Sequence, residues 1–170
     1  MKKKEYDVII IGAGPAGIFT ALELTKKNNI SVLILEKGKE IEKRECPMRS
    51  KGGGCFHCSP CAIISGWGGA GAFSDGKLNL STEIGGQLDN YINKNKVAEL
   101  IKYADDIYLE FGADKTVYGT NEGEIDIIKK EASLAKMKLI PTRIRHLGTE
   151  KCVEILKKMQ DYLRAKIDIK

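Results

Sequence analysis

Long apolar runs and aromatic residues are both scarce in this sequence of 170 residues. No apolar run is longer than that of residues 8–11, far short of the roughly 20 residues of a membrane helix, so a membrane partner is not expected. Aromatic residues make up only 6%, and the basic excess, a net charge of +5, is spread along the chain. A nucleic-acid groove needs clustered basic residues with interleaved aromatics, so nucleic acid is not expected as a partner either.

An export signal is also lacking. The basic residues 2–4 are followed at once by Glu5 and Asp7, and a glycine turn ends the short apolar run that comes next. We therefore expect a cytoplasmic protein. In that compartment the five cysteines are reduced thiols or metal ligands rather than disulfides.

The first 38 residues predict a strand, a helix and a second strand. Residues 6–11 and 31–36 are short apolar runs typical of strands that are buried on both faces. Residues 15–27, between them, have the apolar spacing of a helix. A short crossover between two buried strands indicates a parallel unit, so the predicted fold class is α/β.

A glycine motif joins the first predicted strand to the helix. Gly12, Gly14 and Gly17, with Pro15 and Ala16 between the last two, form the pattern G-x-G-x-x-G. The first glycine permits a tight turn, the second lets a pyrophosphate approach the backbone, and the third lets helix and strand pack closely. The helix N-terminus then offers free N–H groups and a partial positive charge to the phosphates. The motif predicts a Rossmann-like site for a dinucleotide.

Glu36 ends the second predicted strand, 19 residues after Gly17. A carboxylate at this place accepts hydrogen bonds from ribose hydroxyls and repels a 2′-phosphate. NAD or FAD is therefore favoured over NADP. The alternative, a glycine-rich turn that binds nothing, does not require a glutamate at this spacing.

The rest of the chain is expected to be an irregular segment followed by helices. Residues 39–88 hold four of the five cysteines and a glycine-rich stretch, 66–76, whose apolar neighbours argue against a flexible linker. Helices are predicted over 93–111, 124–137 and 149–162, and a strand over 138–145. The last helix is expected to begin with a cap from Thr149 and to bury Cys152, Ile155, Met159 and Tyr162.

Residues 167–170 have the pattern of one more strand. A parallel sheet begun by two strands needs a third neighbour, so we expect an incomplete domain at the front of a longer protein. We divide the chain into residues 1–88, a cofactor-binding unit with a Cys- and Gly-rich loop, and residues 89–170, a mostly helical insertion that leads into the next strand.

Three stretches resemble known flavoproteins. Residues 7–17, Asp-Val-Ile-Ile-Ile-Gly-Ala-Gly-Pro-Ala-Gly, resemble the opening of two-dinucleotide-binding-domain flavoproteins of the glutathione-reductase type. Residues 65–78 (SGWGGAGAFSDGKL) and 143–150 (RIRHLGTE) resemble a group of uncharacterised bacterial FAD-dependent dehydrogenases, whose members are considerably longer. The resemblance implies an FAD-dependent oxidoreductase that takes electrons from NAD(P)H. A missing C-terminal part or a second chain would then be its partner.

The resemblance also implies a role for individual residues. The residues of the glycine motif would face the FAD pyrophosphate, with Lys37 beside Glu36 at the adenosine ribose and Arg44 at a phosphate. The residues against the flavin side of the cofactor would be Gly69, Ala70, Gly71, Asp75 and Gly76.

The cysteines allow four interpretations. Cys55, Cys58 and Cys61 form C-x2-C-x2-C, and Cys46 lies nine positions earlier, so the four thiolates could bind an iron–sulfur cluster. His57 adds a zinc alternative, and a redox thiol pair beside the flavin is a third. The fourth is four reduced cysteines packed as small apolar side chains. The sequence leaves these alternatives open.

Three functions follow from these patterns. The first is the FAD-binding N-terminal portion of a flavin-dependent oxidoreductase. The second is a fragment of an NAD-binding dehydrogenase, and the third is a non-catalytic truncated module that carries an iron–sulfur cluster. No catalytic residue is assigned, since His146 has no carboxylate or nucleophile at a spacing that ties to it. Whether the chain alone is an enzyme, and on which substrate, stays open at this point.

Overall fold

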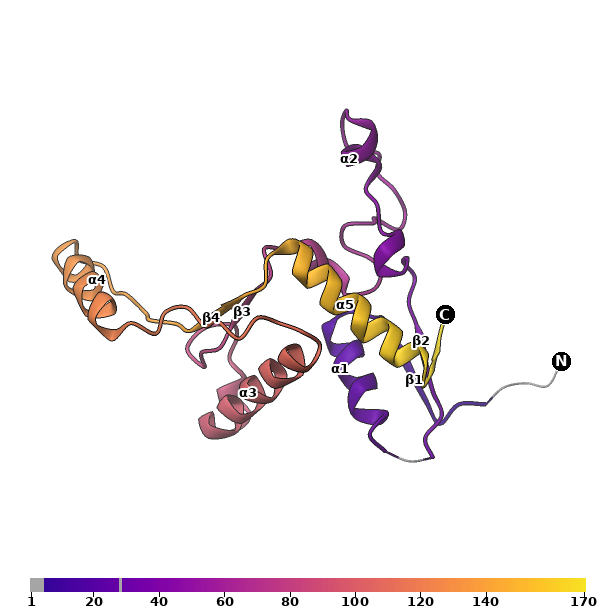
Figure 1. The fold of residues 1–170 in the computed structure, drawn as a ribbon, viewed down its shortest axis with the longest axis horizontal. Coiled ribbons are helices and arrows are strands. Elements are labelled where there is room, and N and C mark those ends of the chain that lie inside the picture. The colour runs from indigo at the N-terminus through magenta and orange to yellow at the C-terminus, as the bar shows by residue number, and fades with distance from the viewer. Residues whose placement is uncertain (1–4, 28) are drawn as a thin grey trace. The chain divides into compact units, whose positions relative to one another are not determined.

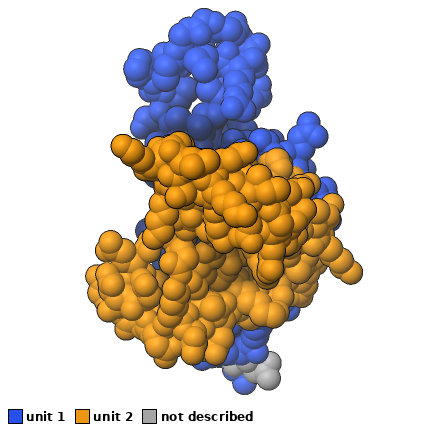
Figure 2. All heavy atoms as spheres, turned by 90° about the vertical axis from the view of Figure 1, so that its left-hand side faces the viewer, with its two compact units in different colours: residues 1–76, 149–170 blue, residues 77–148 orange. Residues whose placement is uncertain are grey.

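The computed structural model describes residues 5–27 and 29–170. The basic residues 2–4, which were weighed above as part of an export signal, lie outside the described residues. The chain divides into two compact units (Figure 2). Unit 1 comprises residues 1–76 and 149–170, and unit 2 comprises residues 77–148. Residues 77–88 therefore group with unit 2 and the last helix groups with unit 1, and the expected division at residue 88 stays a prediction.

A three-stranded parallel sheet forms the centre of unit 1 (Figure 1). Its strands are β1 (Val8–Ile11), β2 (Val32–Leu35) and β5 (Asp168–Ile169), in the order β1-β2-β5. Val8 lies opposite Val32, and Leu33 lies opposite Asp168. The predicted α/β fold is confirmed, including the third strand at residues 167–170.

Helix α1 (Pro15–Leu24) connects β1 to β2 and ends three residues earlier than predicted. Its proline stands in the first turn, where a missing N–H costs nothing. Ile18, Ala21 and Leu22 are its buried residues, at the spacing of one helix face.

Helix α5 (Thr149–Arg164) also belongs to unit 1. Tyr162 was expected in its buried stripe, but 38% of that side chain is exposed, and Leu163 is fully buried instead. A helix repeats every 3.6 residues, so the position four after Met159 continues the stripe and Tyr162 turns away from it. The hydroxyl of Thr149 donates to the carbonyl oxygen of Ser74, and its expected role as the helix cap stays a prediction. The buried residues of α5 are Cys152, Ile155, Leu156, Met159, Gln160 and Leu163.

Strands β1 and β2 differ in burial. Val32, Leu33 and Ile34 of β2 are all buried, as predicted. The prediction was wrong for β1, where Ile9 and Ile11 are 52% and 78% exposed. The physical reason is that only one face of β1 is covered within the described part of unit 1, so alternate side chains of the strand are exposed.

The irregular segment of unit 1 contains one short helix, α2 (Pro47–Lys51), and a 3₁₀ turn at Gly69–Phe73. Trp67, just before that turn, is 1% exposed, and its indole N–H donates to the carbonyl oxygen of Leu156 in α5 at 2.8 Å. The glycine-rich stretch is therefore packed into the unit and is not a flexible linker.

Unit 2 contains an antiparallel pair, β3 (Lys77–Asn79) and β4 (Ile144–His146), and two helices, α3 (Lys94–Glu110) and α4 (Glu122–Leu134). The predicted strand over 138–145 was wrong except at its end, because only residues 144–146 pair with β3. Asn93 and Asn121 cap the two helices, each accepting a backbone N–H three residues ahead. No helix in the described ranges combines the length and apolar character needed to cross a bilayer.

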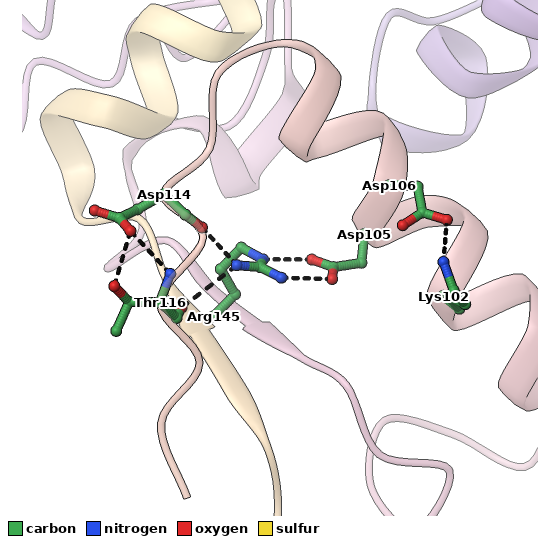
Figure 3. A network of polar contacts seen from close by, with 6 residues as sticks. All are labelled: Lys102, Asp105, Asp106, Asp114, Thr116 and Arg145. Atoms are coloured by element: carbon green, nitrogen blue, oxygen red, sulfur yellow. Dashed lines mark hydrogen bonds and ion pairs between the residues drawn. The ribbon is translucent and has the colours of Figure 1, made fainter. Parts of the chain in front are cut away.

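A buried ion pair holds α3 to β4 (Figure 3). The guanidinium of Arg145 donates to both carboxylate oxygens of Asp105, at 2.6 and 2.7 Å. It also donates to the carbonyl oxygens of Asp114 and Thr116, and only 4% of the residue is exposed. The sequence gives no signal for this pair, because its partners are 40 residues apart.

We expect Asp105→Asn to destabilise unit 2 by about 3–5 kcal/mol, because it leaves a buried guanidinium without its counter-charge. Hydrogen exchange of the α3 and β4 amides measures the loss. The matched control is Asp106→Asn, which breaks the exposed pair with Lys102 and should cost less than about 1 kcal/mol. Equal loss of protection in the two variants would contradict this assignment.

Candidate dinucleotide-binding site

The turn between β1 and α1 has the geometry that its glycines predict. Gly12 has φ of +94°, a left-handed conformation that side chains rarely adopt. A β-carbon on Gly17 would lie 2.1 Å from the carbonyl oxygen of Gly12. The third glycine is therefore required for the close approach of helix and strand.

The N-terminus of α1 has open space beside Gly14. Gly14 is the N-cap residue, no side chain caps the helix, and its first turn has no acidic residue. A β-carbon on Gly14 would meet no atom within 4 Å. Since helix N-terminal N–H groups and the helix dipole favour an anion, this space fits a pyrophosphate.

Glu36 has a different set of partners from the one that sequence predicts. Its Oε2 accepts the backbone N–H of Ala13 at 2.7 Å, and its Oε1 accepts those of Gly38 and Gly66 at 2.8 and 3.0 Å. The carboxylate thus joins the phosphate-binding turn, the end of β2 and the glycine-rich stretch. The expected ribose contact stays a prediction.

The surroundings of Glu36 favour its charged form. Partial burial alone would raise its pKa, but the three backbone N–H groups and the nearby Arg44 outweigh burial and hold the pKa below its ordinary value. The site therefore keeps a fixed negative charge beside the glycine turn, which is the charge expected to repel a 2′-phosphate.

The glycine-rich stretch lies directly against the turn. The backbone N–H of Gly68 donates to the carbonyl oxygen of Ala13 at 2.8 Å, and a β-carbon on Gly69 would lie 3.3 Å from the Cα of Gly14. The sequence singled out Gly69 but missed Gly68 and Ala13, because backbone hydrogen bonds leave no residue-type signal. Of the other expected residues, Ala70, Gly71 and Asp75 are exposed and Gly76 is buried.

Arg44 is buried and its guanidinium donates to backbone carbonyl groups. Only 6% of the residue is exposed to solvent. Its guanidinium carbon lies over the ring of Phe73, 4.8 Å from the ring centre. The accepting carbonyls belong to Ala62, Ile63, Trp67 and Gly69, at 2.6 to 3.0 Å. Arg44 therefore shapes the glycine-rich stretch, and its expected phosphate contact stays a prediction.

A cavity of about 290 Å³ adjoins Glu36. Trp67, Gln160, Arg164 and Lys170 line it with other residues of unit 1. Lys37, which was expected beside the ribose, is exposed and is not among the lining residues. The cavity has room for an aromatic base next to the carboxylate.

The cysteines of the irregular segment are free thiols that the core does not cover. Cys55 and Cys58 are exposed, and Cys46 and Cys61 are half-buried. The interpretation as packed apolar side chains is therefore wrong for Cys55 and Cys58, while Cys46 and Cys61 are partly covered. Within residues 5–27 and 29–170, no group of three or more His, Cys, Asp or Glu side chains is close enough to hold a metal ion. Cys152 is buried in α5 as expected, and burial raises the pKa of its thiol.

Comparison with known proteins gives partial matches. Residues 7–53 match the family described as FAD dependent oxidoreductase. The match covers the glycine turn, Glu36 and Arg44, and supports FAD as the dinucleotide.

Individual relatives match over short stretches. An uncharacterised protein of Clostridium beijerinckii is 39% identical over 71 residues, 41% of this chain and 13% of that protein. Thioredoxin reductase of Bacillus subtilis is 57% identical over 37 residues, 22% of this chain and 11% of that enzyme. Oxygen-dependent choline dehydrogenase of Paraburkholderia phymatum is 55% identical over 38 residues, 22% of this chain and 7% of that enzyme. The matched stretches thus cover only about a tenth of these relatives' length.

We expect Arg44→Lys to lose about 3 kcal/mol of stability, nearly as much as Arg44→Met, because one ammonium group cannot reach four carbonyls. Urea unfolding followed by the fluorescence of Trp67, the only tryptophan, measures the loss. Arg49→Met, at an exposed arginine of α2, is the control and should be nearly neutral. Full rescue by lysine would instead indicate that the charge alone matters.

The loss of folding stability caused by Glu36→Gln should depend on pH. Because the folded state holds the pKa of Glu36 below its ordinary value of 4.5, its carboxylate stabilises the fold above that pH. The contribution is lost as pH falls through the folded pKa. We expect Glu36→Gln to cost about 1–2 kcal/mol at pH 7 and clearly less at pH 3, measured by urea unfolding. A cost that does not change with pH would refute the role of the charge.

Proposed function

We propose that this chain is the FAD-binding part of a flavin-dependent oxidoreductase. The observation that carries the proposal is the uncapped N-terminus of α1, where Gly14 leaves open space in front of the helix. The negative charge of Glu36 beside that space and the family match over residues 7–53 support FAD.

The residues present fit the dinucleotide in a definite way. The pyrophosphate would sit against the backbone N–H groups of Ala16 and Gly17, with Gly69 as the wall on the other side of the turn. Glu36 uses three of its roughly four acceptor positions on backbone N–H groups, which leaves one for a ribose hydroxyl. The adenosine would extend toward the cavity beside Glu36.

The flavin, when bound, supplies the capacity to accept and pass on a hydride. The chain's own residues bind the cofactor and fix its orientation. Glu36 and Arg44 do so indirectly, by holding the glycine turn and the glycine-rich stretch together. We further propose a nicotinamide dinucleotide as the electron donor, bound by polypeptide beyond these 170 residues, which would also contribute the substrate pocket.

We expect the purified chain to bind FAD, measured by titration calorimetry. ADP should compete with FAD because it carries the groups that the turn and Glu36 recognise, whereas riboflavin should not. Gly14→Ala should weaken FAD binding about tenfold or more, because its methyl group occupies the pyrophosphate space. Stability should be kept, since that methyl group meets no protein atom.

The matched control is Gly54→Ala, where an added β-carbon also meets no atom and the backbone is not left-handed. FAD binding should be unchanged in this variant. Tight binding of NAD without FAD would favour an NAD-binding dehydrogenase. Failure of both dinucleotides to bind, by a chain whose circular dichroism shows it folded, would overturn the proposal.

A further inference from the structure

Two arginines stand at alternate positions of the segment that forms β4, and the fold uses only one of them. Arg145 lies within β4, and Arg143 continues the pairing by one residue, since its carbonyl oxygen accepts the backbone N–H of Leu80 at 2.8 Å. Alternate residues of a strand lie on the same face. Arg145 is buried against Asp105, whereas Arg143 is exposed and, in the described part of the chain, its guanidinium has no hydrogen bond or ion pair.

A cavity of about 280 Å³ adjoins Arg143 within unit 2. Helix α3 contributes one face to its lining, at the spacing i, i+3, i+4 and i+7, through Ala98, Ile101, Lys102 and Asp105. Leu80 and Val117 belong to the two segments that pair with residues 143–146, and they add apolar surface to the lining. The cavity is therefore largely apolar, with charged groups from α3 and Arg143.

The charges around this cavity leave a positive excess. Both carboxylate oxygens of Asp105 accept from Arg145, at 2.6 and 2.7 Å (Figure 3). The ammonium group of Lys102 is paired with Asp106 at 2.5 Å. With these two pairs neutral, Arg143 supplies one positive charge that the lining residues do not balance. A ligand with a single negative charge would balance it.

Arg143 also lines a second cavity of unit 2, of about 290 Å³, beside α4. Glu122 and Asp126 line that cavity, and Asp126 is paired with Lys129 at 3.3 Å. The carboxylate of Glu122 would repel an anion there. The largely apolar cavity beside α3 is therefore the better place for an anionic ligand of Arg143.

We propose that the cavity beside α3 binds a small carboxylate with an apolar body, held by Arg143. A guanidinium is planar and presents paired N–H donors that match the two oxygens of a carboxylate. Thr120, which also lines the cavity, offers a hydroxyl as a further donor. The apolar residues would contact the body of the ligand, and the cavity is close to the lower limit of about 300 Å³ for ligand pockets. A ligand of the size of benzoate therefore suits it.

Titration of the ¹⁵N-labelled full chain with benzoate tests the proposal. We expect the backbone amide signals of α3 around Ala98 and Ile101 to shift, with a Kd of about 1 mM, typical of so small a ligand. Benzamide has the same shape without the charge and should bind about tenfold more weakly. Arg143→Gln should weaken benzoate binding about tenfold or more, and Arg143→Lys should lie between, because lysine keeps the charge but not the paired donors.

Arg49→Gln, at an exposed arginine of α2 in unit 1, is the matched control and should leave benzoate binding unchanged. Ala98→Leu tests the cavity with Arg143 in place. It adds bulk at an exposed position of α3 and keeps a strong helix former, so the chain should stay folded while benzoate binding is lost. The amide spectrum of each variant without ligand shows whether it is folded.

The inference does not rest on FAD binding, since every residue involved belongs to unit 2. FAD titration of the same variants should give the affinity of the unchanged chain, so failure of one site is distinguishable from failure of the other. No shift of the α3 signals at about 10 mM benzoate, ten times the expected Kd, would overturn the proposal. Equal binding of benzamide or of inorganic phosphate, or benzoate binding that survives Arg143→Gln or Ala98→Leu, would overturn it as well.

Discussion

The carboxylate of Glu36 is the interaction on which the candidate site depends. It joins three backbone segments that are distant in sequence: the turn before α1, the end of β2 and the glycine-rich stretch at Gly66. Each bond is between an ionised acceptor and a backbone donor, which makes it stronger than a bond between neutral groups. Without this charge the glycine-rich stretch would lose one of its links to the turn.

Arg44 complements Glu36 from the other side of the same stretch. Glu36 accepts backbone N–H groups, while Arg44 donates to backbone carbonyls, so the two charges satisfy opposite halves of the irregular backbone. Burial lowers the pKa of Arg44, and the nearby charge of Glu36 acts in the opposite direction. A buried polypeptide without regular secondary structure needs such partners for its backbone groups. The same two side chains therefore shape the wall of the dinucleotide space, while Arg44 alone also donates to the carbonyl oxygens of Ala62 and Ile63.

Sequence reasoning predicted well wherever local residue type decides the structure. The parallel strands, the proline at the start of α1 and the three glycines of the turn all follow from short-range patterns. It was wrong for the strand at 138–145 and for Tyr162, where neighbouring elements decide which residues pair or become buried. It also missed the pair of Arg145 and Asp105, since nothing in a linear pattern relates side chains 40 residues apart.

The residues alone determined that a strand, a glycine turn and a helix would follow one another, and that a second strand would then end in a glutamate. This is because φ freedom, helix N-terminal polarity and carboxylate charge are properties of the residues themselves. Only the tertiary structure decided what Glu36 and Arg44 contact and which thiols reach the surface. Those outcomes depend on which distant backbone groups are left without partners once the sheet and α5 are in place. A charged side chain is then drawn to the unsatisfied donors or acceptors it can reach, and sequence spacing does not specify them.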